Sequence, residues 1–105
     1  MTGIGGCRSS GAISADTLIF TGGGKLISIH GYATGTDTGY VTIHDCLTQG
    51  ACNNANMLGM LYVGLASAGD AYNEADMHGV RFTTGLFADV TDVSGTGTTF
   101  TVEFN

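Results

Sequence analysis

Four residues of this chain carry ligand atoms that transition metals prefer, and they come close together in the sequence. They are His30, His44, Cys46 and Cys52. Zinc binds imidazole nitrogen and thiolate sulfur, usually through four ligands in spacings such as C-x2–4-C or H-x3–5-H. Five residues separate the two cysteines, and the histidines fall on different predicted strands, so the spacing does not fit. We therefore expect no metal and no other cofactor, and we interpret the histidines as surface residues hydrogen-bonded to Thr or Tyr.

The cysteines also bear on redox state. Three cysteines, Cys7, Cys46 and Cys52, cannot all pair within one chain, so the sequence is not that of a secreted disulfide scaffold. Cys46 and Cys52 could close a small loop as a disulfide, or both could stay reduced. The sequence leaves these two states open.

Carboxylates could hold calcium or act as a general acid and base. Calcium needs several oxygens converging at about 2.3–2.6 Å, and the loop pattern D-x-[DN]-x-[DN]-G does not occur in the sequence. The two glutamates give no support for glycoside cleavage by paired carboxylates. We interpret the acidic residues as solvated turn carboxylates. Those considered for calcium are Asp70, Glu74, Asp76, Asp89 and Asp92, and the second glutamate is Glu103.

The sequence also lacks the motifs of nucleophilic catalysis and phosphate binding. Residues 64–69, Gly-Leu-Ala-Ser-Ala-Gly, do not have the G-x-S-x-G spacing of a nucleophile elbow. Cys7 lies in a small-residue segment, which is a poor place to hold catalytic geometry. Residues 22–25 lack the spacing and the Ser/Thr of a P-loop. We therefore predict that the protein is not an enzyme, takes no small-molecule substrate and has no catalytic or cofactor-binding residues.

Four tyrosines remain as candidates for recognition, because this side chain offers an apolar ring and a polar tip. They could line one sugar-binding or protein-binding face, or they could lie at the edge of the core. The sequence favours neither interpretation. The four are Tyr32, Tyr40, Tyr62 and Tyr72.

Charge narrows the range of partners. The 105 residues carry a formal net charge of −6 with only 3 Lys and Arg together. Nucleic acids and anionic membranes both attract Lys and Arg, so neither partner is expected. Charged residues are 11% of the chain, against roughly 25% in typical soluble domains, which suits outer faces partly covered by neighbours. Because neither a membrane span nor a signal peptide is apparent, we expect a soluble protein made in the host cytoplasm.

The elements that hold these side chains are predicted to be strands. The chain has 18 glycines and no proline, which favours many short strands joined by tight turns. Alternation predicts seven or eight strands in one antiparallel β-sandwich or jelly-roll-like domain over residues 17–105, preceded by an extended arm over residues 1–16. Ile4 and Ile13 could anchor this arm on its own domain or on a neighbour. The predicted strands are 17–21, 25–32, 40–45, 57–66, 80–83, 86–90 and 98–104, with a long loop at 47–56, a turn at 67–70 and an ambiguous segment at 71–77.

Two of these strands predict where the histidines lie. Alternation turns the aliphatic side chains of 25–32 and 40–45 inward, with Ile27 and Ile29 together in the first segment. If the two segments pair, Ile29 lies opposite Val41 or Ile43. The polar residues then gather on the other face of the same sheet; they are His30, Thr42 and His44.

The order of these segments resembles the small β-sandwich virion proteins of tailed bacteriophages, in which a "vTiyD" strand, an "F-x-x-G-L" strand and a terminal "x-x-T-V-x-F/Y" strand recur. The resemblance covers about four-fifths of the chain. His44 stands where the pattern often has an aromatic residue, and the loop between Cys46 and Cys52 is a second departure. The matching segments are 25–29 (KLISI), 39–45 (GYVTIHD), 80–86 (VRFTTGL) and 99–104 (TFTVEF).

This resemblance implies a structural virion protein without catalytic residues. Members of such families are similar to capsid decoration (cement) proteins, head fibres and tail accessory proteins. We expect a decoration protein on the capsid surface, a symmetric homo-oligomer such as a trimer, that binds the major capsid protein and stabilises capsomer contacts. The predicted contacts are the arm at 1–16 and the loop at 47–56. The alternative is a carbohydrate- or receptor-binding module of a tail or head fibre.

Overall fold

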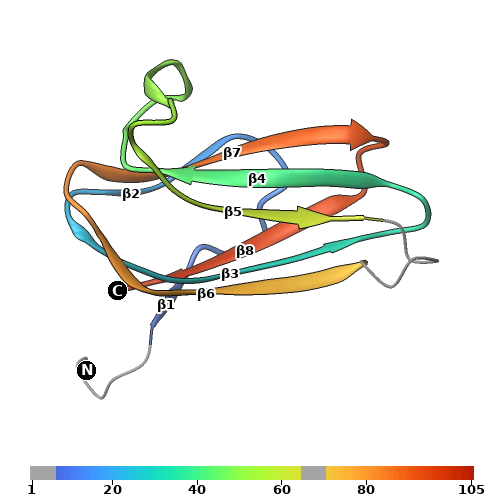
Figure 1. Cartoon of the computed structure of the whole chain (residues 1–105), viewed down its shortest axis with the longest axis horizontal. Helices are drawn as coiled ribbons and strands as arrows, with labels where there is room; N and C mark the ends of the chain where they lie inside the picture. Colours follow the sequence, from blue (N-terminus) through green and yellow to red (C-terminus); the bar gives the residue numbers. More distant parts are fainter. Residues whose placement is uncertain (1–6, 65–70) are drawn as a thin grey trace.

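Two antiparallel β-sheets pack face to face in the computed structural model, which describes residues 7–64 and 71–105 (Figure 1). Ile4, Asp70 and the predicted turn at 67–70 lie outside the described residues. No helix in the described part of the chain is long and apolar enough to cross a membrane. The elements are β1 (Arg8–Ser9), β2 (Thr17–Thr21), β3 (Gly24–Ala33), β4 (Thr38–His44), η1 (Gln49–Ala51), β5 (Met57–Val63), β6 (Tyr72–Phe82), β7 (Gly85–Ser94) and β8 (Thr98–Phe104).

The strand order is that of a jelly roll. One sheet, called sheet A here, has the order β1-β8-β3-β6, and the other, sheet B, has the order β2-β7-β4-β5. All strand pairs are antiparallel, and every connection except the β4–β5 hairpin crosses to the opposite sheet. Two such interleaved sheets make a double-sheet jelly roll. The predicted all-β fold class is therefore confirmed.

The core lies between the sheets and is filled by alternate residues of the strands. β8 turns Phe100, Val102 and Phe104 inward, as its alternation predicts. β4 likewise buries Val41 and Ile43. Burying one such side chain contributes about 1.5–3 kcal/mol. The core cluster consists of Ile13, Leu26, Ile29, Ala33, Val41, Ile43, Leu61, Val63, Phe82, Leu86, Ala88, Phe100, Val102 and Phe104.

In β3 the predicted alternation fails at one residue. The pairings of β3 with both β6 and β8 shift register between Leu26 and Ser28, which marks a β-bulge at Ile27. Leu26 and Ile29 are both fully buried, whereas Ile27 stays half-buried. A bulge inserts one extra residue into a strand, and strict alternation takes no account of it. The prediction that Ile27 and Ile29 share the core face was wrong for this reason.

The predicted pairing of 25–32 with 40–45 was also wrong, because β3 and β4 belong to different sheets. β3 pairs with β6 and β8, whereas β4 pairs with β5 and β7. Ile29 therefore reaches the core from sheet A, and Val41 and Ile43 reach it from sheet B. His30 and His44, with the opposite parity, lie on the outer faces of different sheets. The two histidines are on opposite sides of the sandwich.

Residues 72–82 form one long edge strand, β6, where the sequence left 71–77 ambiguous and predicted a separate strand at 80–83. The register against β3 jumps from Leu26↔Val80 to Ser28↔Asp76, so 77–79 form a bulge on this strand. His78 and Gly79 have φ angles of 54° and 73°. This left-handed pair interrupts the alternation, which explains why the residues of β6 carry no continuous strand pattern.

The described part of the predicted arm packs on its own sandwich. Arg8 of β1 pairs with Phe104 at the edge of sheet A. Ile13 is only 3% exposed, and its N–H and C=O both hydrogen-bond to Phe100. The carboxylate of Asp16 accepts a hydrogen bond from the N–H of Val90 in sheet B. Of the two predicted anchor residues, Ile13 therefore anchors the arm on its own domain.

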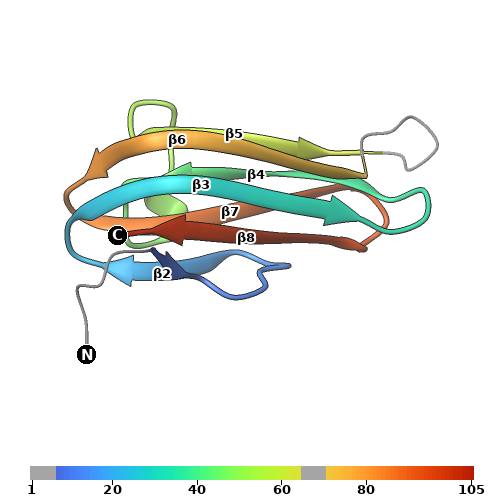
Figure 2. The same cartoon turned by 90° about the horizontal axis from the view of Figure 1, so that it is seen from below.

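The two long sides of the sandwich differ. On one side the edge strands of the two sheets, β5 and β6, lie side by side (Figures 1 and 2). On the other side the edge strands are the very short β1 and the five-residue β2, which has an irregular register between Leu18 and Phe20. Short and irregular strands blunt a sheet edge. Within the described residues, the long unpaired edges thus lie on the β5–β6 side, called the open side below.

Candidate functional site

Two polar clusters lie on the outer faces of the sheets, and each contains one of the predicted histidines. The cluster on sheet A is centred on His30 of β3. Its Nε2 lies 3.1 Å from Oγ of Ser28 and 3.2 Å from Oε1 of Glu103, and its Nδ1 lies 3.3 Å from Oε2 of Glu74. The hydroxyl of Ser28 donates a hydrogen bond to Glu103. The neighbouring strands β6 and β8 thus supply one glutamate each to the histidine between them.

This His30 cluster contains serine, histidine and acid but not the rest of a hydrolase site. The Ser28 hydroxyl is hydrogen-bonded to Glu103, and β3 is a central strand paired on both sides. An oxyanion hole needs hydrogen-bond donors free to point at a substrate. Hydrogen bonds from Ser28 and His30 hold the pKa of Glu103 below its ordinary value. The cluster is a solvated hydrogen-bonded network, and exposed ion pairs of this kind contribute little to stability.

The four tyrosines divide into two cross-strand pairs, one on each outer face. Tyr32 lies opposite Tyr72 on sheet A, and these side chains are 48% and 58% exposed. Tyr40 lies opposite Tyr62 on sheet B. One face lined by all four tyrosines, as one interpretation of the sequence had it, is therefore wrong. The Tyr32–Tyr72 pair borders a depression of about 300 Å³ that is also lined by His30, Gly31, Thr99 and Thr101.

The cluster on sheet B is centred on His44, at the end of β4, and the loop at 45–56 covers it. His44 is only 5% exposed. Its Nδ1 lies 3.1 Å from the carbonyl oxygen of Asn53 and 2.9 Å from Oδ1 of Asn56, so this nitrogen is the donor. Nε2 then accepts from the hydroxyl of Thr42 at 2.9 Å. The predicted hydrogen bond to a threonine is confirmed, but the predicted surface position of His44 was wrong because the loop folds back over it.

Thiols and a carboxylate complete the cluster around His44. Cys46 and Cys52 are both free cysteines, with their Sγ atoms 3.2 Å apart. Of the two states that the sequence left open, the structure therefore has the reduced one. A ring nitrogen of His44, Sγ of Cys52 and a carboxylate oxygen of Asp89 all lie within 4.8 Å of one another. Asp89 comes from β7, where it pairs with Thr42 of β4.

Acidic groups crowd this cluster. Burial, and then the neighbouring Cys46, Asp89 and Asp16, raise the pKa of Cys52 to about 12. Burial also raises the pKa of Asp89, and Asp16 raises it further through its charge and a shared hydrogen bond. In the described part of the chain only His30 and His78 form ion pairs, so no Lys or Arg pairs with these carboxylates. The anionic forms of Cys52 and Asp89 are therefore disfavoured.

Asp45, the residue after His44, has a structural role. Its carboxylate accepts hydrogen bonds from the N–H groups of Thr83, Thr84 and Gly85 at 2.9, 2.8 and 3.1 Å. Burial pushes the pKa of Asp45 upward, but these hydrogen bonds outweigh burial and the pKa lies below its ordinary value. Asp45 thus ties the end of β4 to the turn between β6 and β7.

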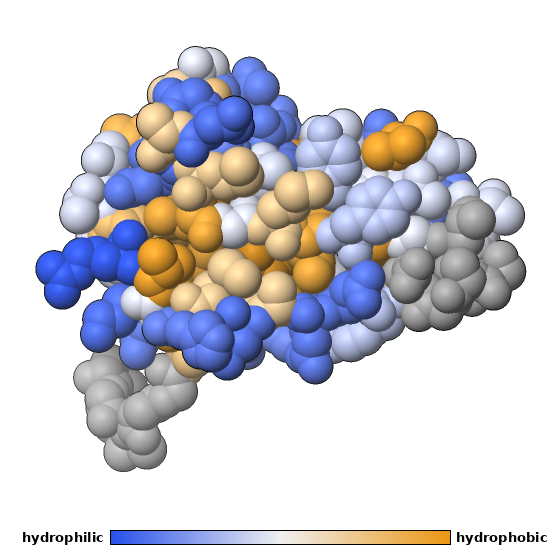
Figure 3. All heavy atoms as spheres, in the orientation of Figure 1, coloured by the Kyte–Doolittle hydropathy of each residue, from blue (hydrophilic) through white to orange (hydrophobic). Residues whose placement is uncertain are grey.

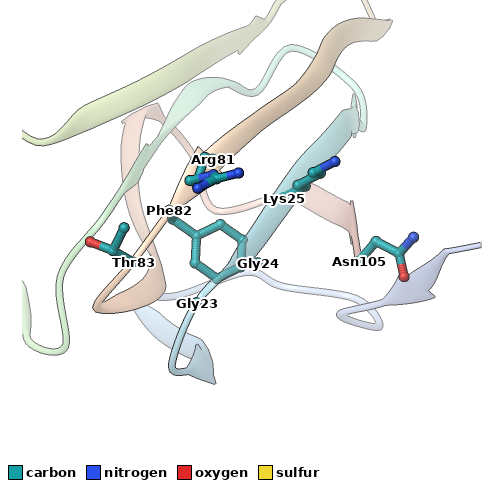
Figure 4. A pocket seen from close by; sticks show the side chains of 7 residues that line it. All are labelled: Gly23, Gly24, Lys25, Arg81, Phe82, Thr83 and Asn105. Atoms are coloured by element: carbon teal, nitrogen blue, oxygen red, sulfur yellow. The ribbon is translucent and has the colours of Figure 1, made fainter.

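A depression of about 560 Å³ at the end of sheet A gathers two of the three strong cations (Figure 4). Lys25 and Arg81 pair across β3 and β6, and both are exposed. The ring of Phe82 packs so closely on Gly24 that a Cβ there would come within 2.7 Å of it. Because the two cations are solvated, this depression offers weak attraction for anions rather than an enclosed binding site.

The open side carries exposed apolar residues of both edge strands. Met57 and Met60 of β5 and Val80 of β6 are exposed there, with Met60 at 49%. Leu58 and Met77 lie half-buried against the core on the same strands. Figure 3 shows the apolar colour gathered on this side, across the region of β5 and β6. Apolar exposure beside unpaired strand edges is typical of protein contact surfaces.

The structure brings together three of the four predicted metal-ligand residues, His44, Cys46 and Cys52, and places His30 on the opposite face. Sequence reasoning missed Asp89 as their neighbour. The β4–β7 register that brings Asp89 there is a long-range pairing without a local signal. The residues considered for calcium are dispersed: Glu74 and Asp76 are on β6, Asp89 and Asp92 are on β7, and Asp70 is outside the described residues.

Comparison with known proteins finds no match to this chain. No protein-family model, no curated protein and no solved structure matches it. The resemblance to phage virion proteins therefore stays a prediction based on short motifs, and function has to be argued from the surfaces described above.

Proposed function

We propose that the protein is a structural component that binds another protein through its open side, and specifically a decoration (cement) protein on the capsid surface of a tailed phage. The observation that carries this proposal is the open side itself. Unpaired N–H and C=O groups of β5 and β6 border Met57, Met60 and Val80, and apolar residues gain free energy when a partner removes them from water. Joining two shell proteins needs such contact area and no chemistry.

The scale of such a contact suits a small domain. A specific interface takes roughly 800 Å² from each partner, about a seventh of the 5517 Å² accessible surface of this chain. Jelly rolls recur in viral capsid proteins and in lectin domains, so the fold fits both this proposal and its alternative and decides neither. The motif resemblance favours the virion.

Two further contacts belong to the proposal. The loop at 47–56 stands out from sheet B near the end of β4 and exposes Leu47 (Figure 1). The arm at 1–16 is the other. Ile13 of the arm is part of the core, so deleting all of 1–16 would also destabilise the domain. Deleting residues 1–6 tests the arm while leaving β1 and Ile13 in place.

Cosedimentation of the purified chain with undecorated heads of its own virus tests the proposal, beside size-exclusion light scattering for the oligomeric state. We expect saturable binding at a fixed ratio to the shell protein and a symmetric oligomer such as a trimer. Met60→Glu should weaken binding at least about tenfold, since it places a charge in an apolar contact. Val93→Glu is the matched control, because Val93 is 60% exposed on β7, away from the open side. Absence of binding by the folded wild type, or equal losses in the two variants, would contradict the proposal.

The alternative, a carbohydrate- or receptor-binding module, has one observation in its favour. The exposed Tyr32–Tyr72 pair lines a depression together with polar groups of His30 and Thr101, and sugar sites combine aromatic faces with a few hydrogen-bonding groups. An oligosaccharide screen tests this reading. Tyr72→Ala should abolish any saturable hit, whereas Tyr62→Ala on the other sheet should retain it.

A further inference from the structure

We propose that His44, Cys52 and Asp89 form a zinc-binding site on the outer face of sheet B. The ligands would come from the end of β4, the loop at 45–56 and β7. Their candidate ligand atoms lie within 4.8 Å of one another. Zinc binds nitrogen, sulfur and oxygen at about 2.0–2.3 Å in a tetrahedron, which places its ligands roughly 3–4 Å apart. Small side-chain movements bring all three atoms to one ion.

The hydrogen bonds of His44 already prepare it as a ligand. In zinc sites the histidine nitrogen that does not bind the metal donates to a carbonyl or carboxylate group, which fixes the tautomer and the ring orientation. Nδ1 of His44 does this with the carbonyl oxygen of Asn53 and Oδ1 of Asn56. Nε2 keeps its lone pair, and its hydrogen-bond partner among the described residues is the hydroxyl of Thr42, a group that can rotate away.

The charge around the cluster favours a cation. Asp16 raises the pKa of Asp89 through its charge, and its carboxylate accepts a hydrogen bond from the N–H of Val90. No Lys or Arg forms an ion pair with either carboxylate among the residues that the structure describes. A divalent ion would supply the missing positive charge. Imidazole, thiolate and carboxylate together suit zinc, whereas calcium and magnesium take oxygen ligands.

Cys46 and water complete the proposed site. Sγ of Cys46 lies 3.2 Å from Sγ of Cys52, so in the zinc-bound state its thiol would donate a hydrogen bond to the Cys52 thiolate and would not itself be a ligand. Water takes the fourth position, because the cluster opens on a depression of about 220 Å³. The bound ion would fasten the loop at 45–56 to β4 and β7. This inference does not depend on the proposed function, and it departs from the sequence-based expectation of no metal, which considered only spacing along the chain.

The test uses the full chain, reduced and freed of metal with a chelator. Calorimetric titration with zinc should give one ion per chain, and zinc should raise Tm in a way that EDTA reverses. Titration with Co²⁺ should produce a thiolate-to-cobalt charge-transfer band. Cys52→Ala and Asp89→Asn should each weaken zinc binding at least about tenfold, and Cys52→Ala should remove the band.

Matched controls separate this site from adventitious binding. Cys7→Ala and Asp76→Asn change an exposed cysteine and an exposed aspartate outside the cluster, and both should bind zinc like the wild type. Cys46→Ala should keep the cobalt band. The proposal is overturned if the reduced wild type binds no zinc, if Cys52→Ala and Asp89→Asn bind it normally, or if the band needs Cys46 and not Cys52. Zinc binding without head binding would contradict only the decoration role.

Discussion

The outer faces of the two sheets carry the same kinds of residues but form different sites. Each face has a histidine, a cross-strand tyrosine pair and carboxylates. On sheet A these side chains stay in solvent, and His30 contacts Glu74 and Glu103. On sheet B the loop at 45–56 folds over the end of β4, so that His44 is buried beside two thiols. The loop, and not the strand pattern, makes the difference.

The same contrast appears in the acids. The pKa of Glu103, on the solvated outer face of sheet A, is lowered by its hydrogen bonds. The pKa of Asp89, under the loop on sheet B, is raised by burial and by Asp16. A covered polar face therefore loses the solvent that would screen its charges. Carboxylates on such a face either destabilise the folded state or bind a cation that neutralises them.

The largest expected effect is a loss of stability when His44 is replaced, and the same replacement of His30 is its comparison. His44→Ala should lower the free energy of unfolding by about 2–3 kcal/mol, because it leaves a cavity and unpaired groups under the loop. His30→Ala, on the solvated face, should change it by no more than about 0.5 kcal/mol. Urea unfolding with chelator and reductant present measures both. Equal effects would show that the loop does not set the two faces apart.

Asp45 should show the next largest effect. Asp45→Asn should cost about 1–3 kcal/mol, because the turn at 83–85 loses its anionic acceptor. The folded-state pKa of Asp45 is lowered, so its contribution is present above the unfolded value of about 3.9 and is lost as pH falls through the folded pKa. Unfolding curves between pH 7 and pH 2 should therefore show less acid destabilisation for Asp45→Asn than for the wild type. Parallel curves would rule out this role.

Asp89→Asn should act in the opposite direction in metal-free protein. The raised pKa of Asp89 means that the folded state binds its proton more tightly than the unfolded state, so stability declines as pH rises from about 3.9 through the folded pKa. Removing the charge should raise stability at pH 7, by less than about 1 kcal/mol because the group is partly solvated. Thermal unfolding in EDTA measures this gain. A loss of stability would mean that Asp89 is already compensated by a partner.

The smallest expected effect is the shift in the pKa values of the two acids, Glu103 and Asp89. NMR titration of side-chain carboxyl carbons should place the pKa of Glu103 below 4.5 and that of Asp89 above 3.8. Glu103→Gln should leave the titration of Asp89 unchanged, since the two lie on opposite faces. Shifts in the same direction would remove the electrostatic contrast between the faces.

Local patterns predicted the local structure well. The alternation of residues 98–104 and of β4 gave the correct core side chains, because each of these strands runs without a bulge through its inward residues. It failed at Ile27, which is one extra residue against β8, and at 77–79, where three residues of β6 lie opposite one residue of β3. Alternation states which residues share a face but not which strands share a sheet, so His30 and His44 were predicted together and lie apart. The contact of Asp89 with His44 and Cys52 depends on strand pairing and a folded-back loop, and neither leaves a local signal.

The blunted β1–β2 side limits how many copies could join edge to edge. A strand can be added to the long edges of β5 or β6, but the opposite side offers only two residues on one sheet and an irregular strand on the other. Fibre growth by edge pairing requires two adhesive sides on every copy. Within the described residues only the β5–β6 side carries such edges, so edge pairing between copies would stop at a finite number of copies.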